Sequence, residues 1–279
     1  MEIAATPDPA KSKSRRRWCQ YSLRTPLIFV TLAGCGFGWL GFKVREARRQ
    51  QAAVAAIRKS GGFVAYDYQF DARDGDIPNA IPPGPAWLRS LLGRDFFGNV
   101  RTVFLLGEQI ADADVERLKE FTALKSLSLH GTRVTDSGLE NLAGLTQLTE
   151  LMLDGTQISD AGLERLRVLT KLDTLLLDGT QVAGPGLERL QGAAHLRFMC
   201  LSDTRVTDAG LQHLKGLTQL EFLYLDGTQI TDAGLENLNG LSQLEHLWVD
   251  RTQVTEAGVA KLQKSLPTCV IYRGPSHDN

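Results

Sequence analysis

Residues 223–241, LYLDGTQITDAGLENLNGL, are rich in the residue types that bind metal ions or phosphate. Two aspartates, two threonines, a glutamate and three glycines fall within these nineteen positions. A calcium loop of the EF-hand type does not fit, because Thr228 and Ile230 follow Asp226 where further oxygen ligands are needed. Asp232 instead stands directly before an apolar run with helical spacing, which is a favourable N-cap position. The stretch is therefore predicted to be mostly scaffold.

The same pattern recurs along most of the chain. Seven copies, each 24 residues after the one before, follow LxxLxLxGTxITDxGLxxLxxLxx. The LxxLxL part alternates as a short strand does, and GLxxLxxL has helical spacing. One such unit cannot bury its apolar face alone, so we expect the units to stack with seven parallel strands about 4.8 Å apart. The copies begin at Val103, Leu127, Leu151, Leu175, Met199, Leu223 and Leu247.

The pattern resembles the leucine-rich repeat family over residues 100–273. In one copy the matching residues are Leu220, Leu223, Leu225, Ile230, Leu235, Leu238 and Leu241. The GT-x-(I/V)-T-D-x-G-L variant is similar to repeats of bacterial and of F-box-associated proteins, but no F-box-like segment is apparent. An apolar segment before the repeats makes the chain most similar to bacterial membrane-anchored members. The resemblance implies an α/β solenoid with a parallel sheet on its concave face and helices on its convex face.

Polar residues at fixed positions are expected to stabilise the turns of each repeat. Aspartate is predicted to cap the helix, and in the fourth copy Gly184 takes this position before Pro185, which favours the first helical position. Threonine after each strand is expected to hydrogen-bond loop backbone, and the glycine before it suits a positive φ. Asp203 and Arg251 replace that glycine twice. The predicted caps are Asp136, Asp160, Asp208, Asp232 and Glu256.

The histidines and cysteines offer no catalytic or metal-binding arrangement. His130 and His246 are about five strands apart, roughly 24 Å at the ladder spacing, and cannot share a metal ion. Cys200 and Cys269 are roughly 14 Å apart, whereas a disulfide needs Cα atoms within about 7 Å. The sequence contains no CxxC, HExxH, Walker loop or GxSxG. We therefore predict free thiols, no cofactor, no metal and no enzymatic activity.

Outward-facing strand positions are predicted to form an aromatic surface on the concave face. Side chains alternate along a strand, so every second residue of each strand points away from the leucine core. Rows of apolar side chains on a surface often mark interaction sites, and aromatic anchors carry much of their energy. The alternative is that these residues pack on each other with no ligand. The predicted partner-binding residues are Phe198, Phe222, Tyr224, His246 and Trp248, with Asp226 and Asp250 along one edge.

Thr25–Phe42 is predicted to be a single membrane-spanning helix. Its eighteen residues carry no charge, and at 1.5 Å per residue they extend about 27 Å, close to the hydrocarbon thickness. A cleaved signal peptide and a buried core helix are the alternatives. Basic residues flank both ends, so orientation is undecided, and we favour an extracytoplasmic repeat domain. Gly34 and Gly38 form a GxxxG that could pair two such helices weakly, although glycine is common in membrane helices.

The predicted organisation is a basic tail at 1–24, the membrane helix at 25–42, a linker helix and N-terminal cap at 43–99, the repeats with a C-terminal cap at 100–273, and a tail at 274–279. A net charge of −1 gives no reason to expect nucleic acid. The favoured function is a membrane-anchored protein that binds a protein or peptide through its concave face. A spacer ectodomain without a ligand, or a substrate adaptor of an enzyme complex, is the alternative.

Overall fold

The computed structural model describes residues 24–71, 75, 77 and 80–274, and its side chains from residue 35 onward. The chain divides into two units, Met1–Lys43 and Val44–Asn279. Helix α1 begins at Arg24 in the first unit and ends at Lys59 in the second. In the described part of the chain, no helix is long and apolar enough to cross a membrane. The basic tail before Arg24 lies outside this description, as do the burial and contacts of residues 24–34, which include Gly34 of the predicted GxxxG.

The second unit begins with a cap built on the last turns of α1. Its buried apolar residues include Val54 and Ile57, which belong to the same core cluster as the repeats. The Gln50 amide, 7% exposed, donates to the Gly98 carbonyl at 2.8 Å. The other cap elements are β1 (Phe63–Tyr66), the 3₁₀ helix η1 (Asp67–Gln69), α2 (Ala86–Leu92) and the 3₁₀ helix η2 (Arg94–Phe96).

One nine-stranded sheet runs through the second unit in the order β1 to β9. The cap strand β1 pairs antiparallel with β2, and all later pairs are parallel. Seven of the strands are those predicted from the repeats, and the cap segments add β1 and β9. The remaining strands are β2 (Val100–Phe104), β3 (Ser126–Ser128), β4 (Glu150–Met152), β5 (Thr174–Leu176), β6 (Phe198–Cys200), β7 (Phe222–Tyr224), β8 (His246–Trp248) and β9 (Val270–Tyr272).

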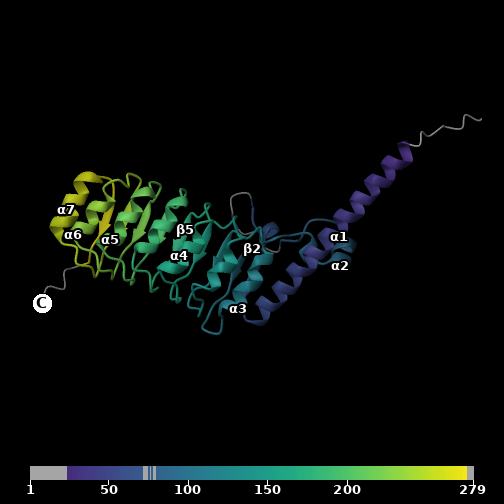
Figure 1. Ribbon diagram of the computed structural model, residues 1–279, viewed down its shortest axis with the longest axis horizontal. Coiled ribbons are helices and arrows are strands. Elements are labelled where there is room, and N and C mark those ends of the chain that lie inside the picture. The colour runs from purple at the N-terminus through teal and green to yellow at the C-terminus, as the bar shows by residue number, and fades with distance from the viewer. Residues whose placement is uncertain (1–23, 72–74, 76, 78–79, 275–279) are drawn as a thin grey trace, which may run out of the picture. The chain divides into compact units, whose positions relative to one another are not determined.

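Short helices connect the strands and follow one another along one side of the sheet (Figure 1). Several repeats use 3₁₀ turns alone or after an α-helical turn, because a 24-residue unit leaves little length for a helix. The helices are α3 (Asp112–Val115), η3 (Glu116–Glu120), η4 (Gly138–Leu142), α4 (Asp160–Leu166), η5 (Pro185–Gly192), α5 (Asp208–Leu211), η6 (Gln212–Gly216), α6 (Asp232–Leu235), η7 (Glu236–Leu238) and α7 (Glu256–Ser265).

The leucine positions of the repeat form one continuous core between the strands and the helices. Leu223 of β7, Leu225 directly after it and Leu238 of the following 3₁₀ helix are each 0% exposed, and the other copies repeat this pattern. This arrangement confirms the predicted α/β leucine-rich repeat solenoid with a parallel sheet.

The predicted threonine and glycine turns are confirmed. The Thr228 hydroxyl donates to the Leu225 carbonyl at 2.6 Å, and the other five threonines of the column make the equivalent bond. Gly227 has a φ of 67°, in the left-handed region that glycine adopts most easily. Asp203 and Arg251 adopt the same conformation with φ of 53°, so the turn is conserved in shape even where the side chain is unfavourable.

The predicted aspartate caps are wrong by one residue. The N-cap of α6 is Thr231, whose backbone is extended and whose hydroxyl accepts from the Ala233 amide at 3.2 Å. Ser159 caps α4 in the same way. Gly184 is the N-cap of η5 as predicted, because Pro185 starts that helix one position later. At Ser159, Thr231 and Thr255 the hydroxyl accepts from an amide of its own helix, so the carboxylate of the next residue is not needed as the cap.

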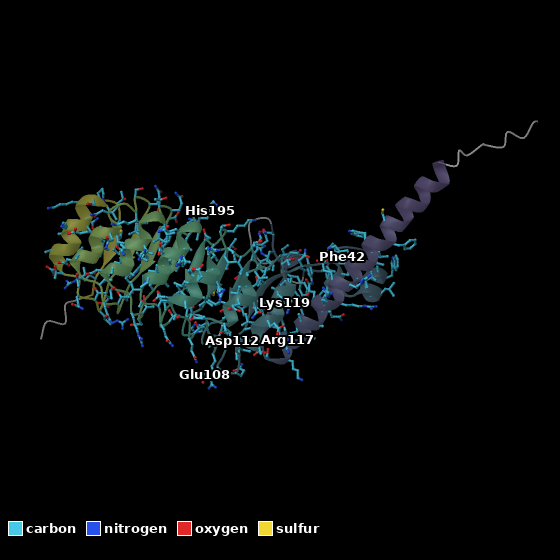
Figure 2. The ribbon with its side chains drawn as sticks, viewed as in Figure 1. Phe42, Glu108, Asp112, Arg117, Lys119 and His195 are labelled. Atoms are coloured by element: carbon cyan, nitrogen blue, oxygen red, sulfur yellow. The ribbon has the colours of Figure 1, made fainter. Side chains whose placement is uncertain are left out.

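Each of these aspartates links its repeat to the next one. The Asp208 carboxylate accepts from the Thr231 amide at 2.8 Å and from the Thr231 hydroxyl at 2.7 Å. We call this pair of contacts the aspartate clamp. A Cβ on Gly234 would collide with Asp208, so the glycine of the pattern makes room for the clamp. The other clamps start from Asp112 (labelled in Figure 2), Asp136, Asp160 and Asp232.

Candidate functional site

The predicted surface lies on the open sheet face, which we define as the side of the sheet turned away from the leucine core. Strand register places Phe198 opposite Phe222, and Phe222 opposite His246. Tyr224 lies opposite Trp248 on the two neighbouring strands. The 24-residue period therefore brings the five predicted aromatic and histidine residues together, since every strand keeps the same register as the one before.

The rings of this group stack in two rows across the strands. Tyr224 and Trp248 are nearly parallel, with ring centroids 3.8 Å apart and planes 4° from parallel. Phe222 lies 5.6 Å from Phe198 and 5.2 Å from His246. The two rows touch through His246 and Trp248, whose centroids are 5.7 Å apart.

Tyr272 extends the second row and was not predicted as a member. Its ring lies 4.7 Å from Trp248, and its hydroxyl is 3.2 Å from His246 Nδ1. It is 41% exposed at the C-terminal end of the sheet. The sequence held a usable signal, because Tyr272 follows Trp248 by one repeat length of 24 residues. We call Phe198, Phe222, Tyr224, His246, Trp248 and Tyr272 the aromatic patch.

The aromatic patch is partly buried by its own packing. All members except Tyr272 are half-buried, so each keeps part of its ring surface accessible. Aromatic pairs of this geometry contribute about 0.5–1.5 kcal/mol beyond the area they bury. The rings are therefore held in place by their neighbours, which limits the side-chain entropy that a partner would have to remove.

The two predicted acidic residues of the edge take part in backbone contacts. The Asp226 carboxylate accepts from the Asp250 amide at 2.7 Å, and Asp250 accepts from the Arg251 amide at 2.9 Å. Burial raises the pKa of Asp226, and the backbone hydrogen bond partly opposes this. Two repeats earlier, after β5, burial and the nearby Asp154 carboxylate raise the pKa of Asp178 to about 6. Both predicted acids thus accept hydrogen bonds from backbone amides of the turn after β8.

The other candidate residues do not assemble into a reactive centre. His130 lies near Asp154, with 3.7 Å between Nδ1 and the carboxylate, away from the aromatic patch. Cys200 and Cys269 are buried free thiols, and burial raises the pKa of both. Within the described residues, no three side chains of histidine, cysteine, aspartate or glutamate could hold a metal ion together.

No family model matches the chain, and no curated protein matches it. Among solved structures, an internalin (inlF) of Listeria monocytogenes aligns with a TM-score of 0.48 and 22% identity, covering 59% of this chain and 52% of its own. Internalin C2 of the same bacterium aligns at 0.49 and 25%, covering 61% and 71%. A leucine-rich repeat protein of Leptospira interrogans aligns at 0.41 and 18%, covering 56% and 50%. The chain thus spans about half the length of the first and third structures.

Proposed function

We propose that the repeat unit binds a protein or peptide partner through the aromatic patch. The observation that carries this proposal is the continuous, half-exposed stack of rings over β6 to β9 on the open sheet face. Interface hot spots are enriched in tryptophan and tyrosine held in well-packed surroundings. A surface of this kind needs no catalytic residue, which agrees with a binding protein rather than an enzyme.

The surroundings of the patch favour a partner with an apolar segment and a basic side chain beside it. Asp226 and Asp250 each have one carboxylate oxygen that accepts a backbone amide, and the second oxygen has no hydrogen-bond partner among the described residues. A lysine or arginine of the partner would be steered to this edge, and apolar side chains would cover the rings.

We also propose that Thr25–Phe42 anchors the protein in a bilayer with the repeat unit on the extracytoplasmic side. The support is the uncharged length of this segment in the sequence. Gly34 and Gly38 would give two anchors a weak contact. This arrangement would present the aromatic patch to partners outside the cell membrane.

The test of partner binding is capture of proteins by the purified full-length chain, compared between the wild type and three variants. In Trp248→Ala the tryptophan that stacks on Tyr224 is removed. Trp87→Ala is the matched control, because Trp87 is 67% exposed on the cap helix α2. Lys261→Ala removes a charge from the exposed side of α7, where it pairs with Glu236.

A partner of the patch should bind the wild type and both controls, and should bind Trp248→Ala about 30-fold more weakly, as loss of about 2 kcal/mol implies. Circular dichroism must show that Trp248→Ala stays folded. Equal affinity of all forms would remove the patch as the binding site. A large loss of stability with affinity intact would favour rings that pack only on each other, as in a spacer.

A further inference from the structure

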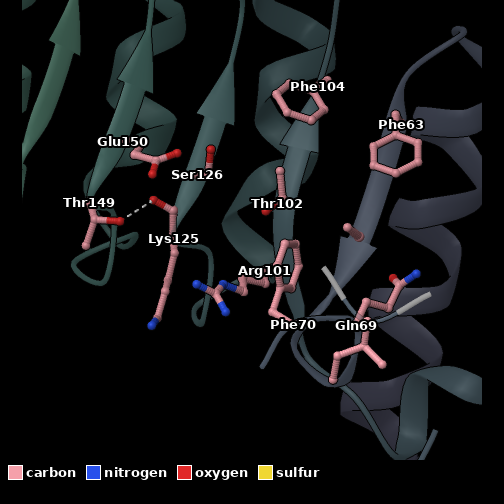
Figure 3. Close-up of a pocket in the computed structure, with 12 residues that line it drawn as sticks. Phe63, Gln69, Phe70, Arg101, Thr102, Phe104, Lys125, Ser126, Thr149 and Glu150 are labelled. Atoms are coloured by element: carbon pink, nitrogen blue, oxygen red, sulfur yellow. Dashed lines mark hydrogen bonds between the residues drawn. The ribbon is translucent and has the colours of Figure 1, made fainter. Parts of the chain in front are cut away.

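A pocket of about 470 Å³ opens on the open sheet face at the opposite end from the aromatic patch. The cap strand β1, the described residues Gln69, Phe70 and Ile77 that follow it, and residues on or beside strands β2, β3 and β4 enclose it (Figure 3). The volume lies within the range of small-molecule sites. Strand β5 separates it from β6, where the aromatic patch begins.

Three phenylalanines give the pocket an apolar side. Phe63 of β1 and Phe104 of β2 stack with their centroids 6.0 Å apart, and Phe63 is 56% exposed. Phe70, on the loop after β1, lies under the guanidinium of Arg101 at 4.3 Å. A flat apolar group entering the pocket would lie beside rings that are already in place.

The floor of the pocket carries two hydroxyl groups without a hydrogen-bond partner among the described residues. Thr102 and Ser126 are each 8% exposed and line the cavity. Neither hydroxyl forms a hydrogen bond with any described residue, yet no fully enclosed side-chain oxygen or nitrogen is left without one. Both hydroxyls therefore keep their access to solvent through the pocket, where they can bond a ligand.

Besides Arg101, which lies over Phe70, two residues of opposite charge line the same pocket. Lys125 directly precedes β3 and Glu150 begins β4, and the Glu150 amide donates to the Lys125 carbonyl at 3.0 Å. Within the part of the chain that the structure describes, neither side chain forms an ion pair. Arg197 and Glu221, farther along the sheet, do pair across neighbouring repeats at 2.7 Å. The pocket thus holds a cation and an anion that are both available to a ligand.

We propose that this pocket binds a small zwitterion with an aromatic side chain, such as a free aromatic amino acid. The carboxylate of the ligand lies at Lys125 and its ammonium at Glu150, which satisfies both charges at once. Its ring lies beside Phe63 and Phe104. A simple anion would leave Glu150 unpaired and facing it, so the zwitterion fits the charge pattern better.

The probe is L-phenylalanine, titrated into the full-length protein and followed by ligand-detected NMR. A ligand of this size should bind with a Kd on the order of 1 mM. Three comparison compounds each lack one feature: N-acetylphenylalanine lacks the ammonium, phenylalaninamide lacks the carboxylate, and L-alanine lacks the ring. Each should bind at least fivefold more weakly. Equal binding of all four compounds, or absence of binding at ten times that concentration, would overturn the proposal.

Variants of the two charged residues assign the ends of the ligand. Glu150→Gln should weaken L-phenylalanine about fivefold and should not weaken N-acetylphenylalanine, because the acetylated compound has no ammonium to pair with Glu150. Lys125→Met should weaken L-phenylalanine and should not weaken phenylalaninamide, which has no carboxylate to pair with Lys125. Lys264→Met, on the exposed side of α7, is the control and should bind as the wild type does. If either pocket variant weakens all compounds equally, the assigned charge pairing is wrong.

Discussion

The aspartate clamps differ in the groups that donate hydrogen bonds to the carboxylate. This difference predicts how much stability each clamp loses when its aspartate is replaced by asparagine. The Asp208 carboxylate contacts one amide and one hydroxyl, both of Thr231. A hydroxyl can accept as well as donate, so the amide group of Asp208→Asn can donate to the Thr231 hydroxyl while its oxygen accepts from the Thr231 amide. Both hydrogen bonds to Thr231 can therefore still form in Asp208→Asn, but with an uncharged side chain.

The clamp from Asp160 meets only backbone amides. Its two oxygens accept from Ala183 at 3.0 Å, Gly184 at 3.1 Å and Gly186 at 2.8 Å. A backbone amide cannot accept, so the NH₂ group of Asp160→Asn faces at least one donor in either orientation. The local reason is the Gly184-Pro185 turn, which moves the helix start and turns three amides toward the carboxylate.

These contacts set the expected loss of stability. Asp208→Asn should lower the free energy of unfolding by about 1 kcal/mol, because it removes a charge from the first turn of a helix and weakens two hydrogen bonds. Asp160→Asn should lower it by about 2–3 kcal/mol, since a half-buried amide is left without an acceptor. The predicted difference between the two variants is therefore about 1.5 kcal/mol.

Hydrogen exchange of the amides in the repeat after each clamp measures this difference locally, which avoids assuming that the whole array unfolds in one step. Urea unfolding of the same proteins gives the total. Asp173→Asn is the control, because this half-buried aspartate lies outside the clamps. Equal losses for Asp160→Asn and Asp208→Asn would refute the argument from donors and acceptors.

Three further expectations concern pH, turn geometry and the N-terminal segment. Burial raises the pKa of Asp178 to about 6, so the ionised carboxylate destabilises the fold above that pH, and this destabilisation disappears as the pH falls toward the ordinary aspartate pKa. Asp178→Asn should therefore stabilise the fold by about 1 kcal/mol at pH 7 and by much less at pH 4. A gain in stability that does not depend on pH would contradict this expectation. Gly131→Ala should lower the free energy of unfolding by about 1 kcal/mol because of the positive φ alone. Gly227→Ala must also displace Asp203 from Arg251, so it should lower the melting temperature further. Equal shifts in melting temperature would show that moving this ion pair has no cost. Full-length protein should stay in the membrane pellet after carbonate washing, and protein without residues 1–43 should not; release of both forms would remove the anchor.

The fold could be predicted because its information is periodic. Each leucine of the pattern occupies the same buried place in every copy, so one repeat length fixes the strand register of the sheet and the columns of the aromatic patch. Tyr272 also follows the 24-residue spacing. The residues before it, Val270 and Ile271, match the leucine pattern only weakly, so the sequence does not clearly mark β9 as the strand that continues the row of Tyr224 and Trp248. The cap elements β1 and α2 have no counterpart in the repeats, so the repeat pattern does not predict that β1 pairs antiparallel with β2.

The aspartate role could not be predicted because it depends on a distance between repeats. A carboxylate before an apolar run has the sequence context of an N-cap, whether or not it also contacts the next repeat. Thr231 and Asp232 are both good capping residues, so the sequence does not choose between them. Only the placement of the next turn, 23 residues later, shows that Asp232 bonds to Thr255 instead. The pocket beside Phe63 was missed for the same reason, since cap and repeat residues meet there.

Every aspartate clamp joins a repeat only to its immediate neighbour, and this gives the chain a mechanical order. If helix α1 were held and the C-terminal side pulled, β9 and then β8 would carry the load first, because each lies at the free edge of the sheet in turn. Each detached repeat would add 24 residues of extended chain, about 80 Å at full extension. The protein would then lengthen in equal steps under tension, and the aromatic patch, which lies over the last four strands, would come apart before the rest of the array.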